Sequence, residues 1–186
     1  MLTKAVKEIT ECISSAEKPI VVAIDGRCAS GKTTLAKMLS EQLDCNVFHM
    51  DDFFLRPGQR TAERLSQVGG NIDYERFENE VLMPLKKEKN FSYRPFDCGT
   101  MSLSQPVDVI FKPVTIIEGS YSCHPALEKY YDLKIFVTVP HEIQLARLEK
   151  RNPALVGRFC DEWIPMEERY FSELGIAEKC HIKICT

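Results

Sequence analysis

Residues 24–34 read IDGRCASGKTT and follow directly on the apolar run Pro19–Ile24. That run is continuous, mostly β-branched and too short for a buried helix, which favours a central parallel strand covered on both faces. The stretch fits the pattern G-x-x-x-x-G-K-S/T, and the leucine spacing after Lys32 predicts a helix. A glycine-rich turn between a strand and a helix indicates a loop that binds phosphate.

The chemistry of this loop suits the phosphate chain of a nucleotide. Gly26 and Gly31 let backbone N–H groups converge on phosphate oxygens, and the following helix directs its positive dipole end at the same anion. Lys32 would reach the β- and γ-phosphates, and the hydroxyl of Thr33 would hold Mg²⁺. A chance match is expected in roughly one chain in a hundred or fewer. The residues predicted to bind the nucleotide here are Gly26, Ala29, Ser30, Gly31, Lys32, Thr33 and Thr34.

The bulk composition is that of an ordinary globular chain. Its 186 residues are 44% hydrophobic and 27% charged, which predicts one domain over residues 1–186. The formal charge of −3 argues against a general nucleic-acid or membrane-surface binder, because those partners favour a basic face. The eight cysteines are scattered without a C-x-x-C pair, and neither a cationic leader nor an apolar run of 18 residues occurs. These features predict a reduced, cytoplasmic protein.

Short apolar segments recur along the chain. Besides the strand at 20–24, strands are expected at residues 46–50, 114–117, 133–139 and, at the sheet edge, 180–185. They predict an α/β fold with a five-stranded parallel sheet flanked by helices, the architecture of P-loop NTPases of the nucleoside- and nucleotide-kinase type. Apolar residues at helical spacing predict an amphipathic helix from Leu2 to Ile13.

Residues 56–112 interrupt this alternation with glycines and prolines in a polar stretch. We interpret the segment as a small substrate-side lobe within the same domain, containing one helix near residues 74–85.

A phosphate-binding loop alone does not define a reaction, because GTPases, ATPases, motors and kinases share it. The sequence contains neither an N-K-x-D segment to read guanine nor a D-x-x-G switch segment, which disfavours a GTPase. A motor or helicase usually needs a longer chain. A small kinase fits these constraints best.

Carboxylates follow two of the predicted strands, where ligands of parallel sheets bind. Asp51 and Asp52 end the second strand, and one of them is expected to face the nucleotide because adjacent residues of a strand point oppositely. A kinase needs such an acid to orient the acceptor hydroxyl and take its proton, and the alternative is a turn-forming Asp pair. Glu118 ends the third strand, where it would hold Mg²⁺ or else cap the next helix.

Arginines late in the chain could reach the transferred phosphoryl group. Arg147 and Arg151 are four apart on a predicted helix and share a face, and Arg158 follows in a short lid over residues 152–160. A closing lid would bring guanidinium groups to the phosphates and exclude water. The alternative is that these arginines are simply solvated.

The motifs GRCASGKTT, MDDFF, GGNIDYERF, YRPFDCGT, IIEGSYS and WIPMEERYF occur in this order over most of residues 20–175. In this the sequence resembles the uridine kinase and phosphoribulokinase-like branch of P-loop kinases, which includes nicotinamide riboside kinases. The resemblance implies phosphorylation of a hydroxyl by ATP, on a five-stranded sheet with a mobile lid. It places the base at Asp51, Mg²⁺ at Thr33 and Glu118, and an acceptor contact at Asp73. Asp73 could equally be the N-cap of a helix that starts at Tyr74.

The sequence departs from uridine kinases in the segment that reads the pyrimidine. Phe96 and Met101 stand where those enzymes have polar groups, so uridine is disfavoured as the acceptor. Arg94 and Asp97 offer a cation and an acid to a different acceptor, or else they pair on the surface, and Phe96 is predicted to line the acceptor site. Lys32, Asp51 and Arg151 are predicted to act in catalysis.

Two alternatives stay open. A nucleoside monophosphate or other metabolite kinase would use basic clamps such as Arg60, Arg64 and Arg94. A regulatory module would bind ATP and transfer nothing. The sequence does not identify the acceptor, does not decide between ATP and GTP as donor, and does not predict an oligomeric state.

Overall fold

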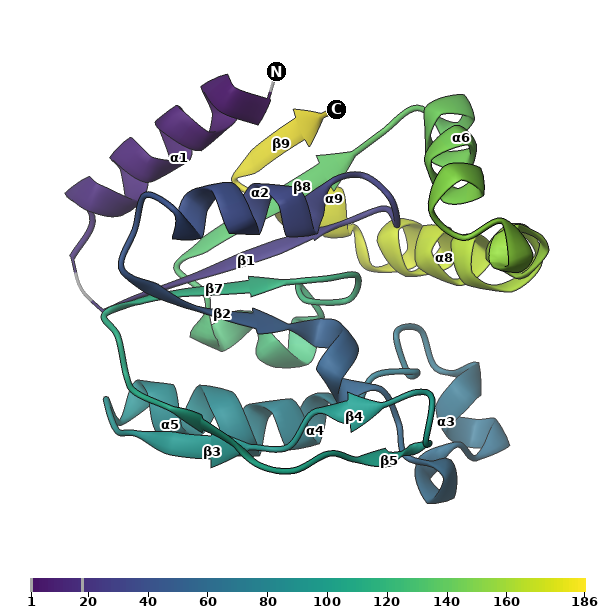
Figure 1. Cartoon of the computed structure of the whole chain (residues 1–186), viewed down its shortest axis with the longest axis horizontal. Helices are drawn as coiled ribbons and strands as arrows, with labels where there is room; N and C mark the ends of the chain where they lie inside the picture. Colours follow the sequence, from purple (N-terminus) through teal and green to yellow (C-terminus); the bar gives the residue numbers. More distant parts are fainter. Residues whose placement is uncertain (1, 18) are drawn as a thin grey trace.

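The computed structural model describes residues 2–17 and 19–186, and its centre is a parallel sheet of five strands in the order β2-β7-β1-β8-β9 (Figure 1). Parallel registers such as Ile20 with Val114 and Ile135 with Ile182 align the carboxyl ends of the strands at one edge. The predicted fold class is therefore confirmed. The strands are β1 (Ile20–Gly26), β2 (Cys45–His49), β7 (Val114–Glu118), β8 (Leu133–Thr138) and β9 (Ile182–Cys185).

Helices cover both faces of the sheet. One face packs on α1 (Leu2–Ser15) and α2 (Lys32–Ser40), whose apolar stripes meet side chains such as Val22 and Ile24 of β1. Ala23, which lies between Val22 and Ile24 in the chain, belongs to the hydrophobic core on the opposite face of the sheet. This alternation along β1 is the period of two expected for a strand that is buried on both sides. The predicted N-terminal helix is confirmed.

The connection from β2 to β7 forms a layer of its own below the sheet in Figure 1. It begins with a 3₁₀ turn, and its longest element is the continuous helix 74–86, which contains a turn of π-helix. Its strands pair in two antiparallel ladders, β3 with β6 and β4 with β5. The elements are η1 (Met50–Phe53), η2 (Pro57–Gln59), α3 (Ala62–Ser66), α4 (Tyr74–Phe77), η3 (Glu78–Leu82), α5 (Met83–Lys86), β3 (Phe91–Tyr93), β4 (Phe96–Asp97), β5 (Ser102–Leu103) and β6 (Val107–Val109).

Aromatic rings attach this layer to the sheet. The Phe53 ring centroid lies 4.8 Å from that of Phe77 and 5.6 Å from that of Tyr93, and Tyr93 lies 5.6 Å from Phe48 of β2. Because edge-to-face and stacked rings at these distances bury large apolar areas, the carboxyl end of β2 is held rigidly over the inserted layer.

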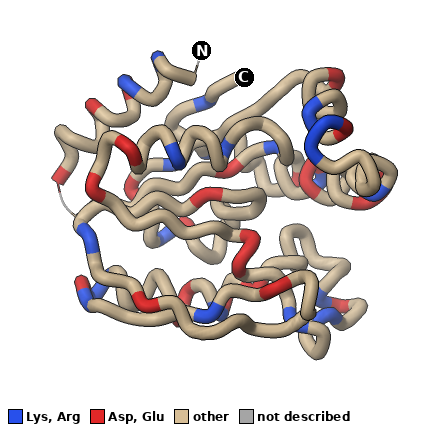
Figure 2. The backbone as a smooth tube through the Cα atoms, viewed as in Figure 1, with Lys and Arg blue, Asp and Glu red and all other residues tan. Residues whose placement is uncertain are grey.

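The chain after β7 passes through η4 (Pro125–Tyr130) and β8 and then becomes mostly helical. Gly175 caps the carboxyl end of helix α8 (Ile164–Leu174), and its φ of 59° is the left-handed conformation common at that position. Figure 2 shows both basic and acidic residues along α6 (His141–Arg151) and acidic residues just after β2. Among residues 2–17 and 19–186, no helix combines the length and the apolar character that crossing a bilayer requires. The remaining elements are α6 (His141–Arg151), η5 (Pro153–Leu155), α7 (Val156–Arg158), η6 (Phe159–Trp163), α8 (Ile164–Leu174) and α9 (Ile176–Lys179).

Candidate active site

A cleft of about 1190 Å³ opens at the carboxyl ends of the strands. Parallel sheets place their ligands at this edge, because loops and helix N-termini converge there. The loop between β1 and α2 forms one wall, the inserted layer forms another, and α6 to α8 form the third. The residues of this cleft that the sequence analysis singled out are Ala29, Ser30, Gly31, Lys32, Thr33, Thr34, Asp51, Arg60, Phe96, Met101, Glu118, Arg147, Arg151 and Arg158.

The two motif glycines have conformations that other residues rarely adopt. Gly26 has φ 138°, and a Cβ there would lie 1.9 Å from the carbonyl oxygen of Val137 on the neighbouring strand. Gly31 has φ 96° at the N-cap of α2. Glycine is therefore required at position 26 by the close approach of β8, and at position 31 by the left-handed turn into the helix.

The side chain of Lys32 is buried at the mouth of the loop. Its Nζ donates hydrogen bonds to the carbonyl oxygens of Gly26 at 2.7 Å and Arg27 at 2.9 Å, and it lies 3.3 Å from Oγ of Ser120. These contacts hold the ammonium group inside the cleft and use its three N–H donors, so an anion that binds it must replace at least one of them.

Thr33 and Glu118 lie together, although 85 residues separate them. The hydroxyl of Thr33 is 3.1 Å from Oε1 and 3.3 Å from Oε2 of Glu118. His49, at the end of β2, places Nδ1 2.6 Å from Oε1 of the same carboxylate, and this hydrogen bond raises the pKa of His49. Hard oxygen donors of this kind suit Mg²⁺. Within the described part of the chain, no group of three or more His, Cys, Asp or Glu could hold a metal ion alone. The pair therefore fits an Mg²⁺ ion that also binds phosphate and water.

Asp51 faces the cleft and its neighbour Asp52 does not line it. The two residues lie in the 3₁₀ turn η1, so the turn, rather than the alternation of an extended strand, separates their side chains. Burial raises the pKa of Asp51, and the positive charge of Lys32 opposes that change. Asp52 instead accepts a hydrogen bond from the hydroxyl of Tyr93 at 3.2 Å. Asp51 is thus the carboxylate available to a ligand.

Arg147 and Arg151 of α6 and Arg158 of the predicted lid all line the cleft. Arg147 donates to the carbonyl oxygen of Ala29 at 3.0 Å, which ties α6 to the phosphate-binding loop. Arg151 lies with its guanidinium carbon 5.9 Å from the ring centre of Phe159. Arg158 donates to Glu162 at 3.1 Å. These arginines line the cleft together with the acidic side chains of Glu162 and Glu167.

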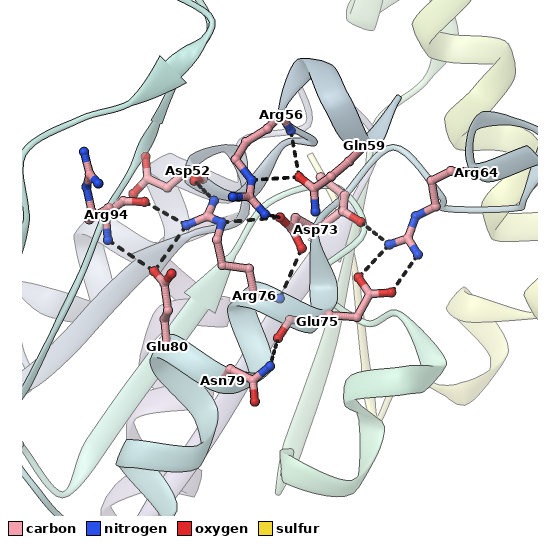
Figure 3. Close-up of polar contacts among 11 residues, drawn as sticks. Asp52, Arg56, Gln59, Arg64, Asp73, Glu75, Arg76, Asn79, Glu80 and Arg94 are labelled. Atoms are coloured by element: carbon pink, nitrogen blue, oxygen red, sulfur yellow. Dashed lines mark hydrogen bonds and ion pairs between the residues drawn. The ribbon is translucent and has the colours of Figure 1, made fainter. Parts of the chain in front are cut away.

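Two predicted substrate residues, Asp73 and Arg94, do not line the cleft. Asp73 is 1% exposed and its Oδ1 accepts the N–H of Arg76, so it is the N-cap of α4. Arg94 is exposed and donates to the carbonyl oxygens of Ser104 at 2.8 Å and Leu103 at 3.1 Å. Figure 3 shows both residues within a polar network of the inserted layer.

Of the basic clamps considered for a phosphorylated acceptor, Arg60 lines the cleft. Arg64 instead forms a two-point ion pair with Glu75, at 2.7 and 2.8 Å, and donates to the carbonyl oxygens of Gly70 and Ile72 (Figure 3). Its guanidinium group therefore serves the inserted layer rather than a ligand.

Asp25 is a buried acid that the sequence analysis did not single out. It is fully buried behind the loop and accepts hydrogen bonds from the N–H groups of Gly26, Tyr121 and Cys123 and from the hydroxyl of Tyr170. Burial raises its pKa to about 6 despite these bonds. The signal in the sequence was a charged residue at the end of an otherwise apolar strand.

Glu167 and Glu168 of α8 were also missed, and both bind the loop. Glu167 accepts the N–H of Cys28 at 2.8 Å, and Glu168 forms a two-point ion pair with Arg27 at 2.5 and 2.8 Å. The pairs are about 140 residues apart in the chain, so no local pattern connects them.

Comparison with known proteins agrees with this geometry. Human nicotinamide riboside kinase 1 is 30% identical to the chain over 169 residues, which cover 84% of this chain and 79% of that protein. The chain belongs to the uridine kinase-like family of P-loop kinases. Uridine kinase-like protein 4 of Arabidopsis thaliana is a further family member, 28% identical over 170 residues. This chain spans about a third of the length of that protein, which corresponds to 83% of its own.

Structures and family models give the same assignment of fold. A protein from Bacillus stearothermophilus described as a possible uridine kinase superposes with a TM-score of 0.73 at 21% identity, over 98% of both chains. The shikimate kinase family model matches residues 28–92. These two findings support the P-loop kinase fold of this uridine kinase-like chain.

Proposed function

We propose that the chain is a kinase that transfers the γ-phosphoryl group of ATP to a hydroxyl of a nucleoside or similar sugar-containing acceptor. The observation that carries the proposal is the meeting, in one cleft, of the buried Lys32, the Thr33 and Glu118 pair, and Asp51. Phosphoryl transfer needs a phosphate cradle, metal ligands and an acid near the acceptor hydroxyl, and these residues are of those three kinds.

Each residue has a separate role in this proposal. The loop N–H groups and Lys32 hold the phosphate chain, and Arg151 with Arg147 offsets the charge that develops during transfer. Thr33 and Glu118 would hold Mg²⁺, which neutralises phosphate charge when bound. Asp51 accepts the proton of the acceptor hydroxyl as the new P–O bond forms. The raised pKa of Asp51 makes it a better proton acceptor than an ordinary carboxylate.

Of the three arginines considered as clamps for a phosphorylated acceptor, Arg60 alone lines the cleft, which favours an acceptor without a phosphate group. Arg64 and Arg94 are engaged in contacts within that layer, as described above. The inserted layer lines the cleft mainly with apolar side chains, among them Phe96 and Met101, besides the polar Arg60 and Asn71. An apolar wall supplies few hydrogen bonds to a pyrimidine, which supports an acceptor other than uridine. We assign residues 56–112 to the acceptor lobe and residues 152–160 to the lid of one domain.

The test is a screen of nucleosides, other ribosides and their monophosphates, with ADP formation as the readout. Asp51→Asn is expected to lower kcat by about 10²–10⁴-fold and to leave ATP binding largely intact. Asp52→Asn is the matched control, because it makes the same change one residue away, outside the cleft. Unchanged turnover by Asp51→Asn, or turnover of monophosphates alone, would contradict the proposal.

A further inference from the structure

Glu167 brings a negative charge from α8 into the phosphate-binding loop. Its side chain is buried, with 5% of the residue exposed, yet it lines the same cleft as Lys32. Oε2 accepts the N–H of Cys28 at 2.8 Å, and Oε1 accepts the hydroxyl of Ser120 at 2.6 Å. The N–H of Cys28, a loop donor of the kind that binds phosphate oxygens, is therefore already hydrogen-bonded to a carboxylate.

The contacts of the flanking residues hold Glu167 in this place. On the same helix, Glu168 pairs with Arg27, and the hydroxyl of Tyr170 donates to Asp25 at 2.9 Å. The first turns of α8 are thus attached to three positions around the start of the loop. Because both partners of each contact are at least partly buried, this attachment is a fixed feature of the fold rather than a surface contact.

The charge of Glu167 acts on the reacting groups. Burial raises the pKa of Asp51, and the negative charges of Glu118 and Glu167 raise it further. Lys32 is the buried cation among these three acids. A triphosphate that entered the cleft would add several negative charges beside them, and like charges a few ångströms apart repel strongly in a partly desolvated site.

We propose that Glu167 competes with the phosphate chain of the nucleotide for the loop, and so sets the affinity of the site for nucleotides. Its carboxylate accepts the hydrogen bond of the Cys28 N–H. Phosphate oxygens that bind the same loop N–H groups either displace the Glu167 carboxylate or remain close to it, where the two negative charges repel each other. The inference rests on the proposed function, because it takes ATP as the phosphoryl donor.

The experiment measures binding without an acceptor, by calorimetric titration with ATP and separately with inorganic tripolyphosphate, each with and without Mg²⁺. Glu167→Gln keeps the size of the side chain and removes its charge, and it is expected to bind both ligands about tenfold more tightly than the unaltered protein. Glu173→Gln is the matched control on the same helix. The Glu173 side chain is 51% exposed and pairs with Arg169. The affinities of this control variant for ATP and tripolyphosphate should therefore stay within about twofold of those of the unaltered protein.

Weaker or unchanged binding by Glu167→Gln would overturn the inference, since a purely structural role of this residue predicts weaker binding. Glu167→Ala removes the same charge and carries the test if Glu167→Gln does not fold. If neither variant folds, saturating tripolyphosphate must still shift the NMR signals of the Cys28 amide and the Glu167 carboxyl in the unaltered protein, and unshifted signals refute the competition. Failure of the unaltered protein to bind ATP would instead remove the proposed function.

Discussion

The buried carboxyl group of Asp25 should make the protein less stable as the pH rises. Asp25 is fully buried at the end of β1, and burial raises its pKa from the ordinary 3.8 to about 6. Hydrogen bonds from Cys123 and Gly26 and the charge of Lys32 lower the pKa but do not compensate for the loss of water. The folded protein therefore holds the Asp25 proton more tightly than the unfolded chain does.

The sign and size of the effect follow from linkage. Because the folded pKa is the higher one, the stabilising contribution is fully present below pH 3.8 and is lost as the pH rises through about 6. The gap of about 2 pH units corresponds to about 3 kcal/mol of unfolding free energy. Above pH 7 the cost of the buried charge is complete and should not grow further.

The assay is urea unfolding of the unaltered protein and of Asp25→Asn at intervals from pH 4 to pH 8. Other groups titrate in this range, but they contribute equally to both proteins, so the difference between the two unfolding free energies isolates Asp25. We expect the unaltered protein to lose about 2.4 kcal/mol relative to the variant between pH 4 and pH 7, because Asp25 of the unfolded chain is already more than half ionised at pH 4. This expectation holds whatever the absolute stability of the variant. A difference that stays constant with pH, or that changes in the opposite direction, would refute the reasoning.

Three further outcomes test the description of the site. Gly26→Ala should lower the unfolding free energy by about 3 kcal/mol or more, because its Cβ would meet the carbonyl oxygen of Val137, and a loss below about 1 kcal/mol in urea unfolding would contradict the close approach. Glu118→Gln should raise the Mg²⁺ concentration for half-maximal ADP formation about tenfold, and an unchanged Mg²⁺ dependence would exclude Glu118 as a ligand. Arg94→Ala should leave the KM for the acceptor within about twofold, because the Arg94 side chain binds backbone carbonyl groups outside the cleft. A tenfold increase in this KM would show that Arg94 contacts the acceptor after all.

Much of the fold could be predicted because each element depends on residues that are neighbours in the chain. The five strands were expected close to where they occur, although the second ends one residue early, at His49, and the last begins only at Ile182. Strand order could not be predicted, because a pairing such as Ile20 with Val114 joins residues far apart in sequence. The helix at 74–86 was recognisable from its own apolar spacing, but its contacts were not.

The predicted site shows the same division. The residue pattern alone could not decide whether Asp51 or Asp52 faces the cleft, and only the family resemblance selected Asp51. The orientation depends on the 3₁₀ turn and on the hydroxyl of Tyr93. Nor could it show that Arg64 and Arg94 are already engaged, because their partners become neighbours only when the inserted layer folds. A sequence does not show whether an arginine is hydrogen-bonded within the protein or exposed and free to bind a ligand.

The sequence by itself determined the phosphate-binding loop, because a strand, two glycines and a helix N-terminus are local features that need no distant partner. Tertiary structure alone decided which acids surround that loop. Asp25 meets Tyr170, and Cys28 meets Glu167, only because the packing of α8 against the sheet brings together residues about 140 positions apart. The physical reason is that backbone geometry is encoded locally, whereas the burial and pairing of a charge depend on everything that packs around it.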